Sequence, residues 1–79
     1  GPVVIEAQLL GLCNAVLAPK QVGTTDNLFE IGASSLKLIE IHEQVDRLYP
    51  GQIDLTEIFD HPTVGDLAKH LSAKLAQPA

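Results

Sequence analysis

Apolar residues that recur at intervals of three and four limit what this chain can fold into. The strongest case is the segment 35–48, whose apolar positions are Leu38, Ile41, Val45 and Leu48. This spacing places side chains on one face of a helix. The Pro50-Gly51 pair then ends the pattern. We therefore predict a helix over residues 35–48 that buries this face.

Two other segments show the same helical period. The first runs from Val3 to Leu17 and ends before Pro19, with apolar positions at Ile5, Leu9, Leu12 and Val16. The second follows Thr63, which forms the pattern of a capping box with Asp66. Its apolar positions are Val64, Leu67, Ala68, Leu71 and Leu75. Both segments are predicted to be amphipathic helices with one buried face.

A shorter apolar segment, Ile53–Phe59, lies just before Pro62. Its length suits one or two turns of helix. Few segments of the chain alternate apolar and polar residues as a half-buried strand would. The expected fold class is therefore all-α, a four-helix bundle with three main helices and one short third helix.

Residues 19–34 separate the first two predicted helices and are expected to form a long loop. The segment is rich in turn-forming residues, which are Gly23, Thr24, Thr25, Asp26, Gly32 and Ser34. A connection of this length is unusual in a compact domain unless it has a function. Leu28, Phe29 and Ile31 give the loop apolar side chains that can hold it against a core. We expect this loop to position a functional group.

Composition limits both the size of the fold and the class of function. With 79 residues, of which 46% are hydrophobic and 19% charged, the chain is predicted to form one small domain. No apolar run approaches the length of about 20 residues that crosses a bilayer, and no signal-peptide pattern opens the chain. These features indicate a soluble, cytoplasmic protein. The net charge of −5 disfavours binding to nucleic acid or membranes and favours partners with basic patches.

The two ends of the chain are expected to lie outside the folded domain. Residues 1–2, Gly-Pro, resemble the remnant of a cleaved tag. Residues 77–79, Gln-Pro-Ala, resemble the start of a linker. The predicted domain therefore spans residues 3–76 of a longer protein and is expected to be monomeric.

The predicted helix over 35–48 has a mixed face opposite its buried one. Leu36 and Ile39 fall on this outer side of the helix. The charged residues around them are Glu40, Glu43, Asp46 and Arg47. From Asp26 to Asp66 the chain has nine acidic residues and two basic ones. A few apolar anchors within a charged rim are typical of a docking surface, although a solvated face with two isolated apolar residues has the same pattern.

Two serines stand where the long loop meets this helix. Gly32 allows backbone angles that other residues avoid, and Ser34 is a good N-cap. Ser35 would then take the first helical position, with its hydroxyl near solvent. A phosphate esterified to Ser35 would lie beside the free amides at the positive end of the helix dipole. Ordinary helix capping also accounts for two serines at this place.

The residues around Ser35 carry a resemblance to a known family. Residues 26–36 read DNLFEIGASSL, and residues 58–64 read IFDHPTV. Both segments resemble the acyl and peptidyl carrier domains of polyketide and nonribosomal peptide synthases, whose core reads Asp-x-Phe/Leu-x-x-Gly-x-Asp-Ser-Leu and whose last helix often follows Phe-x-x-Pro-Thr. The resemblance covers nearly the whole chain, including the helix order and the long first loop. Ser34 stands where the family usually has an aspartate.

This resemblance implies a carrier domain without catalytic activity of its own. In the family the serine before the leucine, here Ser35, bears covalent 4′-phosphopantetheine, which a separate phosphopantetheinyl transferase delivers from coenzyme A. The thiol of this arm holds an acyl or peptidyl chain as a thioester. The implied partners are the transferase and the ketosynthase, acyltransferase or other domains of a modular synthase. We expect polyketide assembly rather than peptide assembly.

The resemblance also implies a partner-binding surface on two helices. Family members meet basic patches on transferases and synthase domains through the helix that follows the serine. The residues at these positions are Leu36, Ile39, Glu40, Glu43 and Asp46, and the short third helix is expected to add Glu57 and Ile58. This surface includes the mixed face found from the helical period.

Two catalytic or metal-binding alternatives for the region around Ser35 fit less well. A serine hydrolase would need a histidine and an acid in reach of Ser35, and Leu36 breaks the Gly-x-Ser-x-Gly pattern. A calcium loop that begins at Asp26 would need oxygen ligands where Leu28 and Lys37 stand. Neither catalytic nor calcium-binding residues are predicted here.

The cysteine and the histidines are expected to have structural or surface positions. Cys13 follows Leu12 on the apolar stripe of the first helix, which favours a small core residue over a nucleophile. His42, His61 and His70 have no partner at the i, i+4 spacing of a metal site. We therefore predict no metal-binding residues.

A different class of function remains open at this point. A small acidic helical domain could bind partners through residues 35–48 and never be modified. Composition and amphipathicity suit this docking module as well as they suit a carrier. The feature that separates the two is Ser35 in its Gly-x-x-Ser-Leu setting, for which simple docking has no need.

Overall fold

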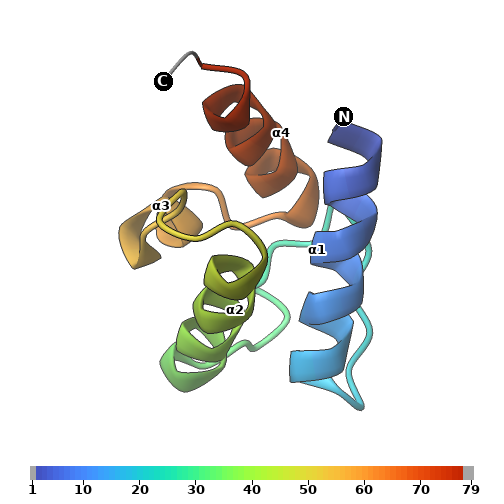
Figure 1. The fold of residues 1–79 in the computed structure, drawn as a ribbon. Coiled ribbons are helices and arrows are strands. Elements are labelled where there is room, and N and C mark those ends of the chain that lie inside the picture. The colour runs from blue at the N-terminus through green and yellow to red at the C-terminus, as the bar shows by residue number, and fades with distance from the viewer. Residues whose placement is uncertain (1, 78–79) are drawn as a thin grey trace.

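The computed structural model of this chain describes residues 2–77 and has four helices in that range. They are α1 (Pro2–Leu17), α2 (Ser35–Leu48), α3 (Leu55–Asp60) and α4 (Val64–Leu75), as Figure 1 shows. The predicted all-α bundle with a short third helix is confirmed. No helix in this part of the chain is both long enough and apolar enough to span a membrane.

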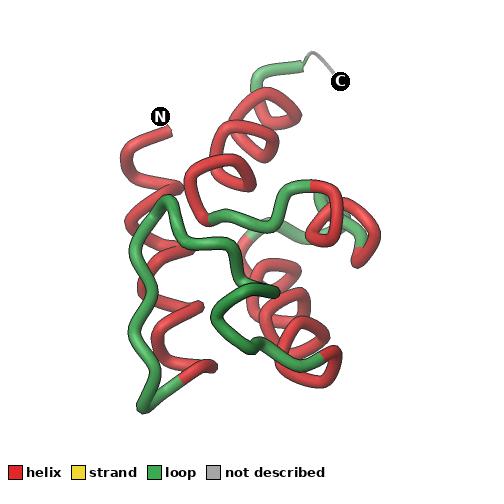
Figure 2. The backbone as a smooth tube through the Cα atoms, turned by 180° about the vertical axis from the view of Figure 1, so that it is seen from behind, coloured by secondary structure: helices red, strands yellow, loops and turns green. Residues whose placement is uncertain are grey.

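The long helix α1 holds the bundle together from one side. It packs against both α2 and α4, and α2 in turn contacts α3. In Figure 1 the short α3 lies on the side of α2 and α4 that faces away from α1. The reverse view in Figure 2 shows the loop after α1 running back along that helix before it turns into α2. This return path places the start of α2 at one end of the bundle.

The core is formed by one face of each main helix together with residues from the loops. Its side chains are Ile5, Leu9, Cys13, Leu17, Val22, Leu28, Leu38, Ile41, Val45, Ile53, Ile58, Val64, Leu67, Ala68 and Leu71. On α1 the fully buried residues follow a strict four-residue spacing, so the predicted stripe positions Leu12 and Val16 lie at its edge and are only partly buried. Cys13 is buried, as predicted. This burial raises the pKa of its thiol to about 12.

Two residues predicted to be buried lie instead at helix ends that extend past the core. Leu48, the last residue of α2, is 47% exposed, and Leu75, the last residue of α4, is 42% exposed. Both continue the apolar spacing of their helices correctly. They are exposed because the final turn of each helix extends past the buried residues of that helix.

The helices α2, α3 and α4 each begin at a side chain that accepts a hydrogen bond from a free backbone amide. Thr63 Oγ1 accepts from the amide of Asp66 at 3.1 Å, so the predicted cap of α4 is confirmed. Asp54 Oδ1 accepts from the amide of Glu57 at 2.9 Å and thereby starts α3. The predicted apolar segment began at Ile53. Because Asp54 is the N-cap, the helix itself begins two residues later, at Leu55.

The loop between α1 and α2 is held at several points. Asn14 on α1 accepts from the amide of Val22 at 2.7 Å and donates to the carbonyl of Val22 at 3.2 Å. Further along, the side chain of Leu28 is fully buried, and its amide donates to the carbonyl of Pro62 at 2.9 Å. The prediction that apolar residues hold this loop against the core is confirmed for Leu28.

The predicted tag and linker residues fall largely at or beyond the limits of the described structure. Gly1, Pro78 and Ala79 lie outside the described residues. Of the rest, Pro2 already belongs to α1, and Gln77 follows the last helix.

Candidate functional site

Ser34 and Ser35 lie at the start of α2, as the sequence predicts. The backbone of Ser34 is extended, with φ −75° and ψ 166°. Its side-chain oxygen accepts from the amide of Lys37 at 3.2 Å, and its carbonyl accepts from the amide of Leu38 at 3.0 Å. Ser34 is therefore the N-cap and Ser35 the first helical residue, and both are exposed.

The first turn of α2 leaves hydrogen-bond donors available next to Ser35. The first four amides of any helix have no partner within the helix. Ser34 satisfies those of Lys37 and Leu38, whereas no hydrogen bond within residues 2–77 uses the amides of Ser35 and Leu36. A phosphate ester on the Ser35 hydroxyl would thus lie at the positive end of the helix dipole.

A short turn leads the backbone into this position. The side-chain oxygen of Asn27 accepts from the amides of Phe29 and Glu30 at 2.8 and 3.2 Å, and its carbonyl accepts from that of Ile31 at 3.1 Å. Gly32 then turns the chain with φ +91°, a conformation that side chains disfavour. The turn therefore requires glycine at this place for steric reasons.

The outer face of α2 is exposed as the helical period predicts. Leu36 is 73% exposed and Ile39 is 39% exposed, which is high for aliphatic residues of this size. The three acidic residues of the predicted partner-binding surface on α2 are also exposed, and these are Glu40, Glu43 and Asp46. The structure thus places five of the seven predicted surface residues on one open helix face.

The two residues predicted on α3 are not available in the same way. The side chain of Ile58 is fully buried, so its predicted role as a surface residue is wrong in this structure. Its neighbour Phe59 faces outward instead and stacks on Phe29 of the long loop, with 5.2 Å between ring centroids. In so short a helix, adjacent residues point about 100° apart, so burying Ile58 turns Phe59 towards solvent.

The exposed Phe29–Phe59 pair was missed at the sequence level. Each ring belongs to one of the segments that carry the family resemblance, and each follows a fully buried aliphatic residue. That neighbour relation is the available signal, because adjacent residues of a short helix or turn point in different directions. The pair joins the loop before Ser35 to α3.

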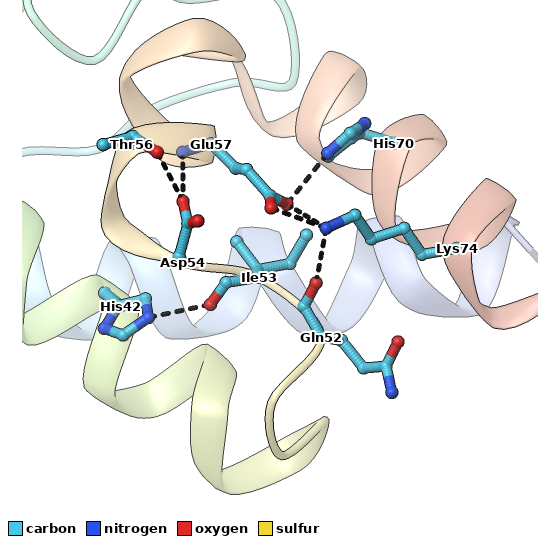
Figure 3. A network of polar contacts seen from close by, with 8 residues as sticks. All are labelled: His42, Gln52, Ile53, Asp54, Thr56, Glu57, His70 and Lys74. Atoms are coloured by element: carbon cyan, nitrogen blue, oxygen red, sulfur yellow. Dashed lines mark hydrogen bonds and ion pairs between the residues drawn. The ribbon is translucent and has the colours of Figure 1, made fainter.

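Glu57, the other predicted residue on α3, binds α4 instead of facing freely outward. Its carboxylate accepts from Lys74 Nζ at 2.6 Å and from His70 Nε2 at 3.0 Å (Figure 3). Lys74 also donates to the carbonyl of Gln52 at 2.9 Å. The hydrogen bond from Lys74 is the main cause that lowers the pKa of Glu57, the bond from His70 adds to it, and partial burial opposes it. Glu57 therefore joins α3 to α4.

All three histidines make contacts within the bundle. The ring of His61 stacks on that of His70, with 4.1 Å between centroids. His42 on α2 donates from Nε2 to the carbonyl of Ile53 at 2.8 Å (Figure 3). Within residues 2–77 no three histidine, cysteine or acidic side chains gather as a metal site would require.

Replacing Glu57 by glutamine should lower the stability of the domain at pH 7 because it removes the charge that pairs with Lys74. Folding lowers the pKa of Glu57, so its stabilisation is complete above the ordinary value of 4.5 and is lost as the pH falls through the lower, folded value. Urea denaturation of both proteins between pH 7 and pH 3 measures this. The difference in unfolding free energy should shrink towards acid pH.

Glu43→Gln is the matched control, because Glu43 is exposed and no hydrogen bond or ion pair within residues 2–77 involves it. It should change stability little at any of these pH values. A Glu57→Gln difference that stays constant down to pH 3 would show that the carboxylate charge does not stabilise the fold.

Comparison with known families identifies the family of this chain. The family described as "Phosphopantetheine attachment site" matches residues 7–71, which include most of the chain and both serines. The chain belongs to this family. Its members are non-catalytic carrier domains of synthases and hold 4′-phosphopantetheine covalently. The exposed start of α2 fits such a group, because a substituent on Ser35 can extend into solvent.

Curated relatives of this carrier domain are large synthases. The chain is 35% identical over 72 residues to bacitracin synthase 2 of Bacillus licheniformis and 38% identical over 68 residues to tyrocidine synthase 3 of Brevibacillus parabrevis. These alignments cover 91% and 86% of the chain, but only 3% and 1% of the relatives. A PKS-NRPS hybrid synthetase of Aspergillus niger is 32% identical over 65 residues, which are 82% of the chain and 4% of the synthetase.

The comparisons do not confirm the predicted preference for polyketide assembly. The relatives are mostly nonribosomal peptide synthetases, with the hybrid enzyme as the link to polyketide synthesis. No solved structure matches the chain. The comparisons therefore establish the carrier family but not whether the synthase makes a polyketide or a peptide.

Proposed function

We propose that this carrier domain bears 4′-phosphopantetheine on Ser35 and moves acyl or peptidyl intermediates between the catalytic domains of a modular synthase. The observation that carries this proposal is the exposed Ser35 hydroxyl at the first position of α2, beside two free amides. When bound, the arm supplies a thiol that holds the intermediate as a thioester. The domain itself presents the serine and orients it.

The surroundings of Ser35 support a modification made by a separate enzyme. No hydrogen bond within residues 2–77 involves its hydroxyl, so no base of this part of the chain activates it. A phosphopantetheinyl transferase would therefore supply both the base and the coenzyme A donor. This need explains why an open position is more useful than a pocket.

We further propose peptide assembly as the context of this domain. The synthases of bacitracin and tyrocidine support it, since both align with more than four fifths of the chain. The proposed partners are the transferase and the catalytic domains next to the carrier in its synthase. The acidic face of α2 favours partners with basic patches.

Intact-mass measurement after incubation with a promiscuous phosphopantetheinyl transferase and coenzyme A tests the proposal. We expect a gain of one phosphopantetheine, located by peptide mapping in the fragment that contains Ser34 and Ser35. The absence of any gain with several transferases would favour the unmodified docking module.

Aspartate at Leu36 or Ile39 should slow arm transfer without unfolding the domain. Both side chains are exposed apolar anchors on α2, and a charge there would disfavour the docked state. We expect kcat/KM for the transferase to fall about tenfold, as for an interface residue worth more than 1 kcal/mol. Steady-state kinetics and circular dichroism measure the two quantities.

Val3→Asp is the control for this pair, because Val3 is also an exposed apolar residue but lies in the first turn of α1. It should leave the transfer rate near that of the wild type. An equal loss of helicity in the Leu36 and Ile39 variants would show that these residues belong to the core.

A further inference from the structure

Lys20 links the two ends of the long loop. Its Nζ donates to the carbonyl of Ile31 at 3.0 Å, across eleven residues of sequence. Lys20 follows the end of α1, whereas Ile31 belongs to the turn that leads into α2. The bond therefore joins the segment just after α1 to the approach of the attachment site.

The same ammonium group lies close to Gly32. A Cβ atom at position 32 would come within 2.8 Å of Lys20 Nζ, which is closer than such atoms approach in proteins. The positive φ of the turn is what requires glycine here, because the ammonium group is the end of a flexible side chain that can move aside. Lys20 and Gly32 also line a pocket of about 290 Å³ together with the N-cap Ser34. The lysine therefore packs against the turn as well as bonding to it.

No other hydrogen bond anchors the last part of this turn from outside. The amides of Ile31, Gly32 and Ala33 all donate to carbonyls within residues 27–29. Within residues 2–77, Lys20 makes the one hydrogen bond that connects residues 31–33 to another part of the chain. Leu28 is held by burial and by Pro62, but it lies at the opposite end of the turn.

We propose that Lys20 is a positioning residue for the attachment of the arm. This inference rests on the proposed modification of Ser35. By holding the carbonyl of Ile31, it holds the backbone three residues before the N-cap. A reacting group that is misplaced by a small distance reacts more slowly. Lys20 acts through the turn and does not touch the reacting hydroxyl.

Lys20→Met tests this, because methionine keeps an unbranched side chain but removes the donor. We expect kcat/KM for arm transfer to fall about threefold to tenfold, as for the loss of one charge-assisted hydrogen bond near the surface. The control is Lys69→Met, which removes the same charge from an exposed position on α4. The control should be modified at the wild-type rate.

Hydrogen exchange separates positioning from a general loss of stability. In Lys20→Met the amides of Gly32 and Ala33 should exchange faster, while those of Tyr49 and Leu67, also hydrogen-bonded, should not change. Faster exchange at all four amides would mean that Lys20 only stabilises the fold. Slower transfer with unchanged exchange would mean that it acts on the donor or the transferase instead.

The outcome also separates this inference from the proposed function. A wild-type domain that gains the arm while Lys20→Met reacts equally fast overturns the role of Lys20 alone. A wild-type domain that gains no arm, although its exchange pattern shows it folded, overturns the proposed function. Equal slowing in the Lys20 and Lys69 variants reduces the effect to net charge and overturns the positioning role.

Discussion

We expect replacement of Ser35 by alanine to abolish attachment of the phosphopantetheine arm, and replacement of Ser34 by alanine to leave it intact. Ser35 is the exposed first residue of α2, with a hydroxyl that no hydrogen bond within residues 2–77 occupies. The Ser34 oxygen, by contrast, is engaged by the amide of Lys37. Loss of this cap should cost about 1 kcal/mol of stability, which leaves the domain folded and able to react.

Intact mass after exhaustive reaction with transferase and coenzyme A measures both variants. The Ser34→Ala protein should gain one arm, and the Ser35→Ala protein none. Circular dichroism of the unreactive variant should match that of the wild type, since no hydrogen bond within residues 2–77 involves the side chain of Ser35. A gain that persists in Ser35→Ala and disappears in Ser34→Ala would move the attachment site by one residue.

Truncating Ile58 to alanine should destabilise the domain by about 2–5 kcal/mol, the range for removing a large buried aliphatic side chain. The residue is fully enclosed between the helices. A domain of this size is stabilised by few kcal/mol in total, so the variant should be close to unfolding. Urea denaturation followed by circular dichroism measures the loss.

Phe59→Ala, one residue further along α3, is the comparison that separates burial from docking. Its exposed ring contributes mainly its stacking on Phe29, and its loss should cost about 1 kcal/mol. If Ile58 belonged to the partner surface, its truncation would leave stability nearly unchanged and would slow arm transfer. That result would contradict the burial seen in the structure.

The main helices could be predicted because their order depends on local features. The apolar period of α2, the cap at Thr63 and the stop at Pro50-Gly51 act within a few residues of one another. The limits of α2 were therefore correct at both ends. Leu48 was predicted to be buried but is exposed. The apolar spacing predicts which side of a helix faces the core, but it does not predict how far along the helix the core extends.

The candidate site was predictable to a similar extent. A serine at a helix start, three residues after a glycine and followed by leucine, points to Ser35 by its chemistry and by its resemblance to a family. The tie from Lys20 to Ile31 was not predictable, because it joins residues that no spacing rule relates. The same holds for the capture of Glu57 by Lys74 and His70 on another helix.

The sequence alone determined the helical class, the long loop and the serine at the head of α2, since these follow from backbone geometry over short distances. Only the tertiary structure decided that Ile58 is buried while Phe59 is exposed, and that the carboxylate of Glu57 pairs with Lys74 on α4. A helix of six residues has too few turns for its apolar spacing to predict which face is buried. The elements packed against it make that choice, because burial is a property of the assembled fold.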